Sequence, residues 1–168
     1  ATEALRPGRA TDRIAVRPFA AADAPRWQAF AQRTPDATFF HAVEWREIIE
    51  RVFRHRTHYL VAERGGEIEG ILPLAEVRSR LFGHSLVSLP FGVYGGPAAT
   101  DAAATRALID AAERLATSLD VDHLELRDRR ALCPGWPRQD LYVTFRKALD
   151  PDPEANMLAV PRKQRAMI

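Results

Sequence analysis

Val87-Ser88-Leu89-Pro90-Phe91-Gly92-Val93-Tyr94-Gly95-Gly96-Pro97-Ala98-Ala99-Thr100 is the stretch that decides the fold. An apolar, strand-like run ends there in a glycine-rich loop, and a helical pattern follows at once. Glycines are expected to let the backbone adopt positive φ and to let a ligand approach the amide groups. The first turn of the helix adds unpaired N–H donors and a partial positive charge. The stretch therefore predicts a ligand site, and a tight strand-to-helix turn without a ligand is the alternative.

The sequence on either side of this stretch alternates between strand-like and helix-like patterns. Before it, the patterns predict strands over residues 13–19, 59–63, 67–77 and 84–89, and helices over residues 23–32 and 45–53. After it, they predict a helix over 102–119, strands over 121–127 and 141–145, and a helical segment from Asp152 that Pro161 interrupts. This order is that of the acetyltransferase-like (GNAT-type) α/β fold, with a mixed, mostly antiparallel sheet flanked by helices.

Several local features refine this prediction. Asp23 is a good N-cap for the first helix, and Pro73 predicts a bulge or an unpaired stretch within a long strand. A strand, a helix and a strand in sequence form a right-handed crossover, so 84–89 and 121–127 should run parallel. The apolar faces expected to form the core comprise Trp27, Phe30, Trp45, Ile48, Ile49, Val52, Leu108, Leu115, Leu124, Leu126, Val143 and Phe145.

Composition excludes several classes of protein. The formal net charge of the 168 residues is only +2, which does not indicate a general nucleic-acid-binding protein. Basic clusters at 51–58 and 162–165 could still meet phosphates, or could be solvated helix faces. The single cysteine, Cys133, cannot form an intramolecular disulfide, and no apolar run is long enough to span a membrane. A cytoplasmic location is expected.

The chain resembles the FemAB family, and specifically its branch associated with exosortase and exopolysaccharide systems. The resemblance runs from about residue 13 to the end of the chain. Its segments, in order, are Thr38-Phe39-Phe40-His41 with Trp45, His58-Tyr59-Leu60-Val61-Ala62, Gly70-Ile71-Leu72-Pro73-Leu74, Leu86-Val87-Ser88-Leu89-Pro90-Phe91, Tyr94-Gly95-Gly96-Pro97, and Pro161-Arg162-Lys163-Gln164-Arg165-Ala166-Met167-Ile168.

FemAB proteins resemble two acetyltransferase-like domains in tandem, and their better-known members transfer an amino acid from aminoacyl-tRNA to an amine of a peptidoglycan precursor. By this resemblance, residues 13–150 form the first domain, and residues 151–168 begin a basic segment that leads to a missing second domain. Residues 1–12 show no periodicity and are expected to form a mobile leader. The implied partners are a phosphate-bearing cell-wall or polysaccharide precursor and, through the missing domain, aminoacyl-tRNA.

The reaction needs two substrates held together, a proton acceptor and fixed donors for an oxyanion. Backbone amides of residues 91–96 are candidate donors. Tyr94 could bind the acceptor, relay a proton or simply pack on Phe91, and His41 is expected to cap or pack rather than act as a base. The residues expected to bind substrate are Phe91, Tyr94, Gly95, Gly96, His41, Trp45, Arg162 and Lys163, and none is assigned as catalytic.

Two other functions stay open. One is a single-domain N-acetyltransferase that uses acetyl-coenzyme A, whose members carry an arginine- or glutamine-led glycine loop around the pyrophosphate. Pro97 removes an amide donor from the loop here, so we expect no cofactor. The other is a non-catalytic module that binds a polyanion or a partner protein. His84 and His123 have no partner at metal-ligand spacing, so no metal site is expected.

Overall fold

The structure is a computed structural model that describes residues 13–79, 81, 83–139 and 143–167. It divides the chain into one compact unit up to Leu132 and a second unit from Cys133 to the end. The expected leader lies outside the described residues. The domain bounds expected from the sequence stay a prediction.

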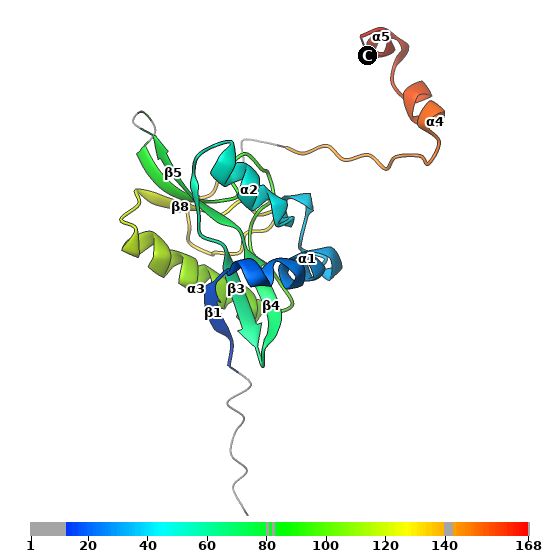
Figure 1. The fold of residues 1–168 in the computed structure, drawn as a ribbon. Coiled ribbons are helices and arrows are strands. Elements are labelled where there is room, and N and C mark those ends of the chain that lie inside the picture. The colour runs from blue at the N-terminus through cyan, green and yellow to red at the C-terminus, as the bar shows by residue number, and fades with distance from the viewer. Residues whose placement is uncertain (1–12, 80, 82, 140–142, 168) are drawn as a thin grey trace, which may run out of the picture. The chain divides into compact units, whose positions relative to one another are not determined.

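Two four-stranded sheets form the centre of the first unit (Figure 1). The first has the order β1 (Ala15–Pro18), β3 (Leu60–Arg64), β4 (Glu67–Leu72) and β7 (Ala98–Ala99). The second has the order β2 (Arg56–Thr57), β5 (Leu74–Ser79), β6 (Gly83–Ser88) and β8 (His123–Glu125). Every pair is antiparallel except β6 and β8, which run parallel as the crossover rule predicts.

Pro73 separates the two sheets. The sequence predicts one long strand over 67–77, whereas the structure ends β4 at Leu72 and begins β5 at Leu74. Proline has no N–H to donate to a ladder, and its carbonyl accepts from the Leu89 N–H at 2.9 Å. The expected interruption at Pro73 is therefore confirmed, and it moves the chain from one sheet to the other.

Helices cover both faces of the first sheet (Figure 1). Trp27 and Phe30 of α1 (Ala24–Arg33) pack with Val61 and Ile71, while Leu108 of α3 (Ala102–Ser118) belongs to a separate apolar cluster. That second cluster contains Leu60, Ala62 and Leu72, which alternate along the strands with the first set. The remaining helices of this unit are η1 (Ala21–Asp23), η2 (Phe39–His41) and α2 (Glu44–Arg51).

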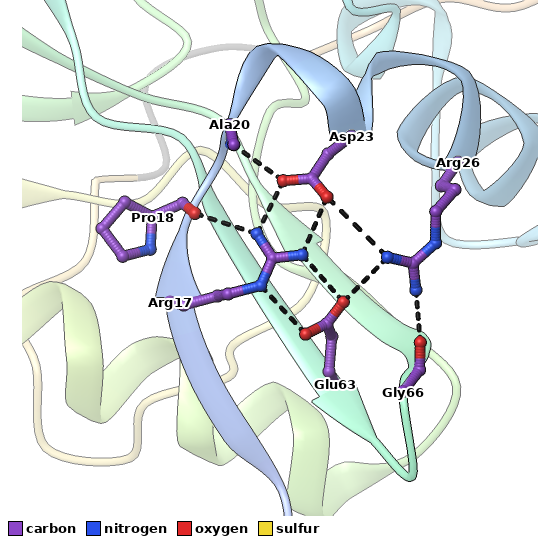
Figure 2. Close-up of polar contacts among 7 residues, drawn as sticks. All are labelled: Arg17, Pro18, Ala20, Asp23, Arg26, Glu63 and Gly66. Atoms are coloured by element: carbon purple, nitrogen blue, oxygen red, sulfur yellow. Dashed lines mark hydrogen bonds and ion pairs between the residues drawn. The ribbon is translucent and has the colours of Figure 1, made fainter.

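Asp23 is the N-cap residue of α1, as the sequence predicts, but its side chain makes no hydrogen bond to the first turn of that helix. Its carboxylate instead accepts from the Ala20 N–H at 2.8 Å and from both terminal nitrogens of Arg17, at 2.6 and 2.8 Å (Figure 2). Arg17 also bonds Glu63, and Arg26 joins Glu63 to the Gly66 carbonyl. This network fastens β1 and α1 to β3, because each carboxylate is shared by donors from different elements.

The predicted core is wrong at four positions. Ile48 and Val52 of the α2 region are 37% and 69% exposed, and Val143 and Phe145 are 78% and 92% exposed. Residues 143–150 form no helix or strand, so the last predicted strand is absent from its described part, and residues 141 and 142 lie outside the description. The second unit contains α4 (Pro153–Leu158) and α5 (Arg162–Arg165), as the pattern interrupted at Pro161 predicts.

Candidate functional site

The carboxyl ends of the parallel strands β6 and β8 meet at the glycine-rich stretch. The Arg127 N–H donates to Ser88 Oγ at 2.7 Å, and the Gly96 N–H donates to the Arg127 carbonyl at 2.9 Å. The Arg127 guanidinium also reaches back to the Gly92 carbonyl at 2.9 Å. Ligands of α/β sheets commonly bind outside the carboxyl ends of parallel strands. These bonds therefore place the segment 92–96 and the segment 127–130 together where a site is expected.

The buried His41 side chain fixes the glycine-rich stretch through a hydrogen bond to its backbone. It is 2% exposed, its Nδ1 accepts from the Thr38 N–H at 3.0 Å, and its Nε2 lies 2.7 Å from the Gly96 carbonyl. A backbone N–H can only donate, so the proton must be on Nε2, which donates to Gly96. Burial lowers the pKa of His41, so the ring is neutral. With both ring nitrogens bonded, His41 is a capping and packing residue, as expected, and not a free base.

The three glycines serve close packing rather than positive φ, which corrects the sequence-based prediction. Positive φ falls on Leu89 (46°) and Phe91 (71°) instead. A Cβ at Gly96 would lie 2.6 Å from Asp128 Oδ2, and a Cβ at Gly95 would lie 2.4 Å from Leu89 Cβ. A Cβ at Gly92 meets a ring atom of the η2 segment at 2.8 Å. The lack of side chains lets the η2 segment and the segment after β8 approach this stretch, and lets the stretch fold closely back on Leu89.

A small, polar cleft opens between these segments. It is lined by Asp36, His41, Tyr94, Gly96 and the run Arg127-Asp128-Arg129-Arg130. Arg127 pairs with Glu125 at 2.6 Å, and Arg130 pairs with Asp36 at 2.9 Å. Arg129 lies over the Tyr94 ring at 5.6 Å and has no carboxylate partner among the described residues. The cleft thus offers one guanidinium that an anion can use without displacing a carboxylate.

Further aromatic residues lie beside the glycine-rich stretch but do not line this cleft. Phe91 is 51% exposed and stacks on Phe53, with ring centroids 3.9 Å apart, while Trp45 packs against Phe39 and Phe40 of η2. The Tyr94 carbonyl accepts from Thr38 Oγ1 at 2.8 Å. Phe91 and Trp45 therefore flank the glycine-rich stretch, while Tyr94, Gly96 and His41 line the cleft itself.

Comparison with solved structures identifies the fold. The chain superposes on a GNAT family acetyltransferase from Staphylococcus aureus with TM-score 0.51 and 14% identity, over 81% of this chain and 98% of that one. A Thermus thermophilus protein, TTHA1254 (I68M mutant), gives TM-score 0.53 and 19% identity over 81% and 98%. An aminoglycoside 6'-N-acetyltransferase from Acinetobacter haemolyticus gives 0.51 and 14% over 81% and 99%. The chain has the GNAT acetyltransferase fold. No family model matches it, and no curated protein matches it.

The first turn of α3 in this GNAT-type fold is already occupied by a carboxylate. Asp101 accepts from the Ala104 N–H at 2.7 Å and pairs with Arg64 at 2.8 Å. Both interactions, the backbone bond first, lower the pKa of Asp101, so it stays ionised. The unpaired donors that the sequence predicts at this helix start are therefore partly satisfied by the chain itself. Two candidate oxyanion donors are also in use, because the Gly92 and Gly96 N–H groups bond the carbonyls of Leu89 and Arg127.

Arg162 and Lys163 belong to a different part of the chain. Both lie in α5 of the second unit and are exposed. Their expected role in substrate binding stays a prediction.

A buried polar cluster on the second sheet was missed from the sequence. Glu76 of β5 is 2% exposed and accepts from Arg78 at 2.6 Å, from His84 at 2.8 Å and from His58 at 3.2 Å. No group of three or more His, Cys, Asp and Glu side chains in the described part of the chain could hold a metal ion. An acidic residue inside the apolar run 71–77 was the available signal, because a carboxylate buried there needs partners.

Arg127 to Arg130 were missed as well. The available signal was a run of charged residues directly after a strand expected to pair in parallel with 84–89.

No helix among the described residues is long and apolar enough to cross a membrane.

Proposed function

We propose that this chain is the first part of an N-acyltransferase of the FemAB kind, which transfers an acyl or aminoacyl group to an amine of a phosphate-bearing cell-wall or exopolysaccharide precursor. The observation that carries the proposal is the cleft at the carboxyl ends of β6 and β8. The GNAT-type fold and the sequence resemblance support the same class of reaction.

The cleft would bind the phosphate of the acceptor through Arg129. This guanidinium is exposed, carries a fixed charge and stacks over Tyr94, which limits its freedom before a ligand arrives. Arg130 and Asp36 close the cleft as an ion pair that an incoming phosphate can exchange with. A bidentate contact between guanidinium and phosphate would orient the acceptor as well as attract it.

Tyr94 would lie against the acceptor at the same place. Its carbonyl is fixed by Thr38, and the neighbouring Gly96 carbonyl is fixed by His41. These two bonds hold the stretch in one geometry, which is what positioning two reactants requires. His41 is neutral and fully bonded, so we assign it to holding Gly96 rather than to proton transfer.

The acyl donor would be bound partly by chain that lies outside these residues. We propose that Arg162 and Lys163 belong to that donor-binding part, and that Trp45 and Phe91 border the acceptor. Aminoacyl-tRNA is the donor that the FemAB resemblance suggests. A donor of that size needs a surface larger than this cleft to hold its acyl end against the acceptor amine.

The proposal is tested by calorimetric titration with UDP-N-acetylglucosamine, a soluble phosphate-bearing precursor. We expect saturable binding that weakens about tenfold in Arg129→Gln, because one charged hydrogen-bond donor is lost. The matched control is Arg106→Gln, an exposed arginine of α3 that pairs with Asp110. Equal binding by wild type and Arg129→Gln, or equal losses in the two variants, would remove the cleft from the proposal.

A further inference from the structure

Six large apolar side chains are exposed in the first unit around α2 and the glycine-rich stretch. They are Phe39, Ile48, Val52, Phe53, Phe91 and Val93, which we name the α2 surface. Rings lie at both ends of α2: Phe39 packs on Trp45 near its start, with centroids 5.8 Å apart, and Phe53, which follows its end, stacks on Phe91. Monomeric proteins rarely expose apolar side chains grouped in this way, so the α2 surface indicates a binding face.

The charges on α2 indicate what covers this face. Glu44, Glu47 and Arg51 form one exposed row at helical spacing, acidic toward the start of the helix and basic at its end. The Glu47 and Arg51 side chains are 59% and 79% exposed and lie 2.6 Å apart. Ile48 and Val52 form a second exposed row directly beside the first, at a spacing of four residues. The helix therefore presents an apolar row bordered by a row whose charge changes sign along its length.

We propose that the α2 surface is a self-association face, occupied by the α2 surface of a second copy of this chain. When two identical helices pack antiparallel about a twofold axis, each flanking row meets the same row of its partner in the reverse direction. Glu47 of one copy then faces Arg51 of the other, twice, while Ile48 and Val52 pack between them. The row is complementary to itself only in this antiparallel arrangement.

The same charges disfavour an anionic membrane or a polyanion as the occupant. Either would bring phosphates against the carboxylates of Glu44 and Glu47, which lie in the same row as Arg51. Nearby basic residues are also partly engaged, because His58 bonds Glu76 and Arg56 lies 4.0 Å from the same carboxylate. A second copy satisfies both signs of charge, whereas a polyanion satisfies one.

The test is sedimentation velocity of the 168-residue chain from about 1 to 300 µM. We expect a reversible dimer in the wild type, and dissociation constants at least about tenfold weaker in Glu47→Arg and in Arg51→Glu, which place like charges together. The double exchange, Glu47→Arg with Arg51→Glu, should restore wild-type affinity. The control exchanges Arg106 and Asp110, an exposed pair at the same spacing on α3, and should leave the dimer unchanged.

Circular dichroism checks that each variant keeps its fold, and Val52→Asp serves as a second disrupting variant that does not involve the charged pair. A wild type that stays monomeric at 300 µM overturns the proposal. So does a double exchange that stays as weak as the single variants. Binding of the wild type to phosphatidylglycerol vesicles that is lost in Arg51→Glu would instead make the α2 surface a lipid-binding face. None of these measurements depends on acyltransferase activity.

Discussion

Glu76 is a buried carboxylate of β5. It accepts hydrogen bonds from its own strand, from the neighbouring strand β6 and from the segment after β2. Burial alone would raise its pKa, but the bonds from His58, Arg78 and His84 outweigh that effect and lower its pKa to about 2. The folded state therefore binds a proton at Glu76 more weakly than the unfolded state does. This linkage stabilises the fold fully above the ordinary pKa near 4.5 and is lost as the pH falls toward 2.

We expect Glu76→Gln to reduce the free energy of unfolding at pH 7 by about 3 kcal/mol, because buried donors lose a charged acceptor. The difference between wild type and variant should shrink as the pH is lowered from 5 to 2. Urea unfolding followed at several pH values measures both effects. Glu113→Gln, at an exposed position of α3, is the control and should be nearly silent. A difference that stays constant across this pH range would contradict the assigned linkage.

Single residues also show where sequence reasoning stops. The glycines at 92, 95 and 96 are visible in the sequence, and their importance to the site is a reasonable prediction. The reason why the structure needs glycine at these positions is not visible in the sequence. For example, the atoms that exclude a Cβ at Gly96 belong to Asp128, which is distant in sequence. The positive φ at Phe91 is likewise not visible in the sequence, because phenylalanine rarely adopts this conformation.

At the scale of elements, the start of α3 bears on the choice of cofactor. A pyrophosphate placed there would meet the Asp101 carboxylate, which already caps Ala104 and pairs with Arg64. Like charges repel, and displacing this cap would cost about 1 kcal/mol of helix stability. We therefore expect calorimetric titration with acetyl-coenzyme A to give no saturable binding in the micromolar range. One-to-one micromolar binding, weakened by added pyrophosphate, would favour the single-domain acetyltransferase instead.

Helices and strands were predicted correctly where the periodic pattern was long and where the elements that pack together follow one another in the sequence. The helix over 102–119 and the parallel strands before and after it follow from periodicity and from the handedness of crossovers. The alternation of Val143 and Phe145 is equally regular, yet both residues are exposed and neither belongs to a strand. Alternation is a local signal, whereas a strand needs a neighbouring strand, so the pattern alone was not sufficient. Ile48 and Val52 were predicted to be buried for a similar reason. An apolar stripe at helical spacing indicates an amphipathic helix, but it does not show which of its residues the rest of the protein buries.

At the scale of the whole molecule, we expect this chain to fold but not to catalyse transfer by itself. The apolar clusters on both faces of the first sheet are complete within the first unit, so thermal unfolding should be cooperative. Acyl transfer from charged tRNA should be absent, and should appear only in a chain extended by a downstream domain. Full activity of the 168-residue chain, lost on changing Tyr94 or on mutating Gly95 and Gly96, would show that one domain suffices.

Sequence reasoning pointed to part of the candidate cleft but not to its charge. Tyr94, Gly96 and His41 were predicted to bind substrate, which stays a prediction, and the structure shows that they line one cleft. The arginines that complete the cleft come from the other strand of the parallel pair. Their approach depends on the bonds between Arg127 and the stretch from Ser88 to Gly96, which arise only once both strands are in place.

The proton between His41 Nε2 and the Gly96 carbonyl has a use of its own. It is buried and strongly bonded, so its exchange with bulk water should be slow enough to give a resolved imidazole N–H resonance in the NMR spectrum. That resonance would be a native reporter of the glycine-rich stretch. Any ligand that shifts Gly96 changes the length of this bond and hence the resonance frequency, without a label, a mutation or an assay of turnover.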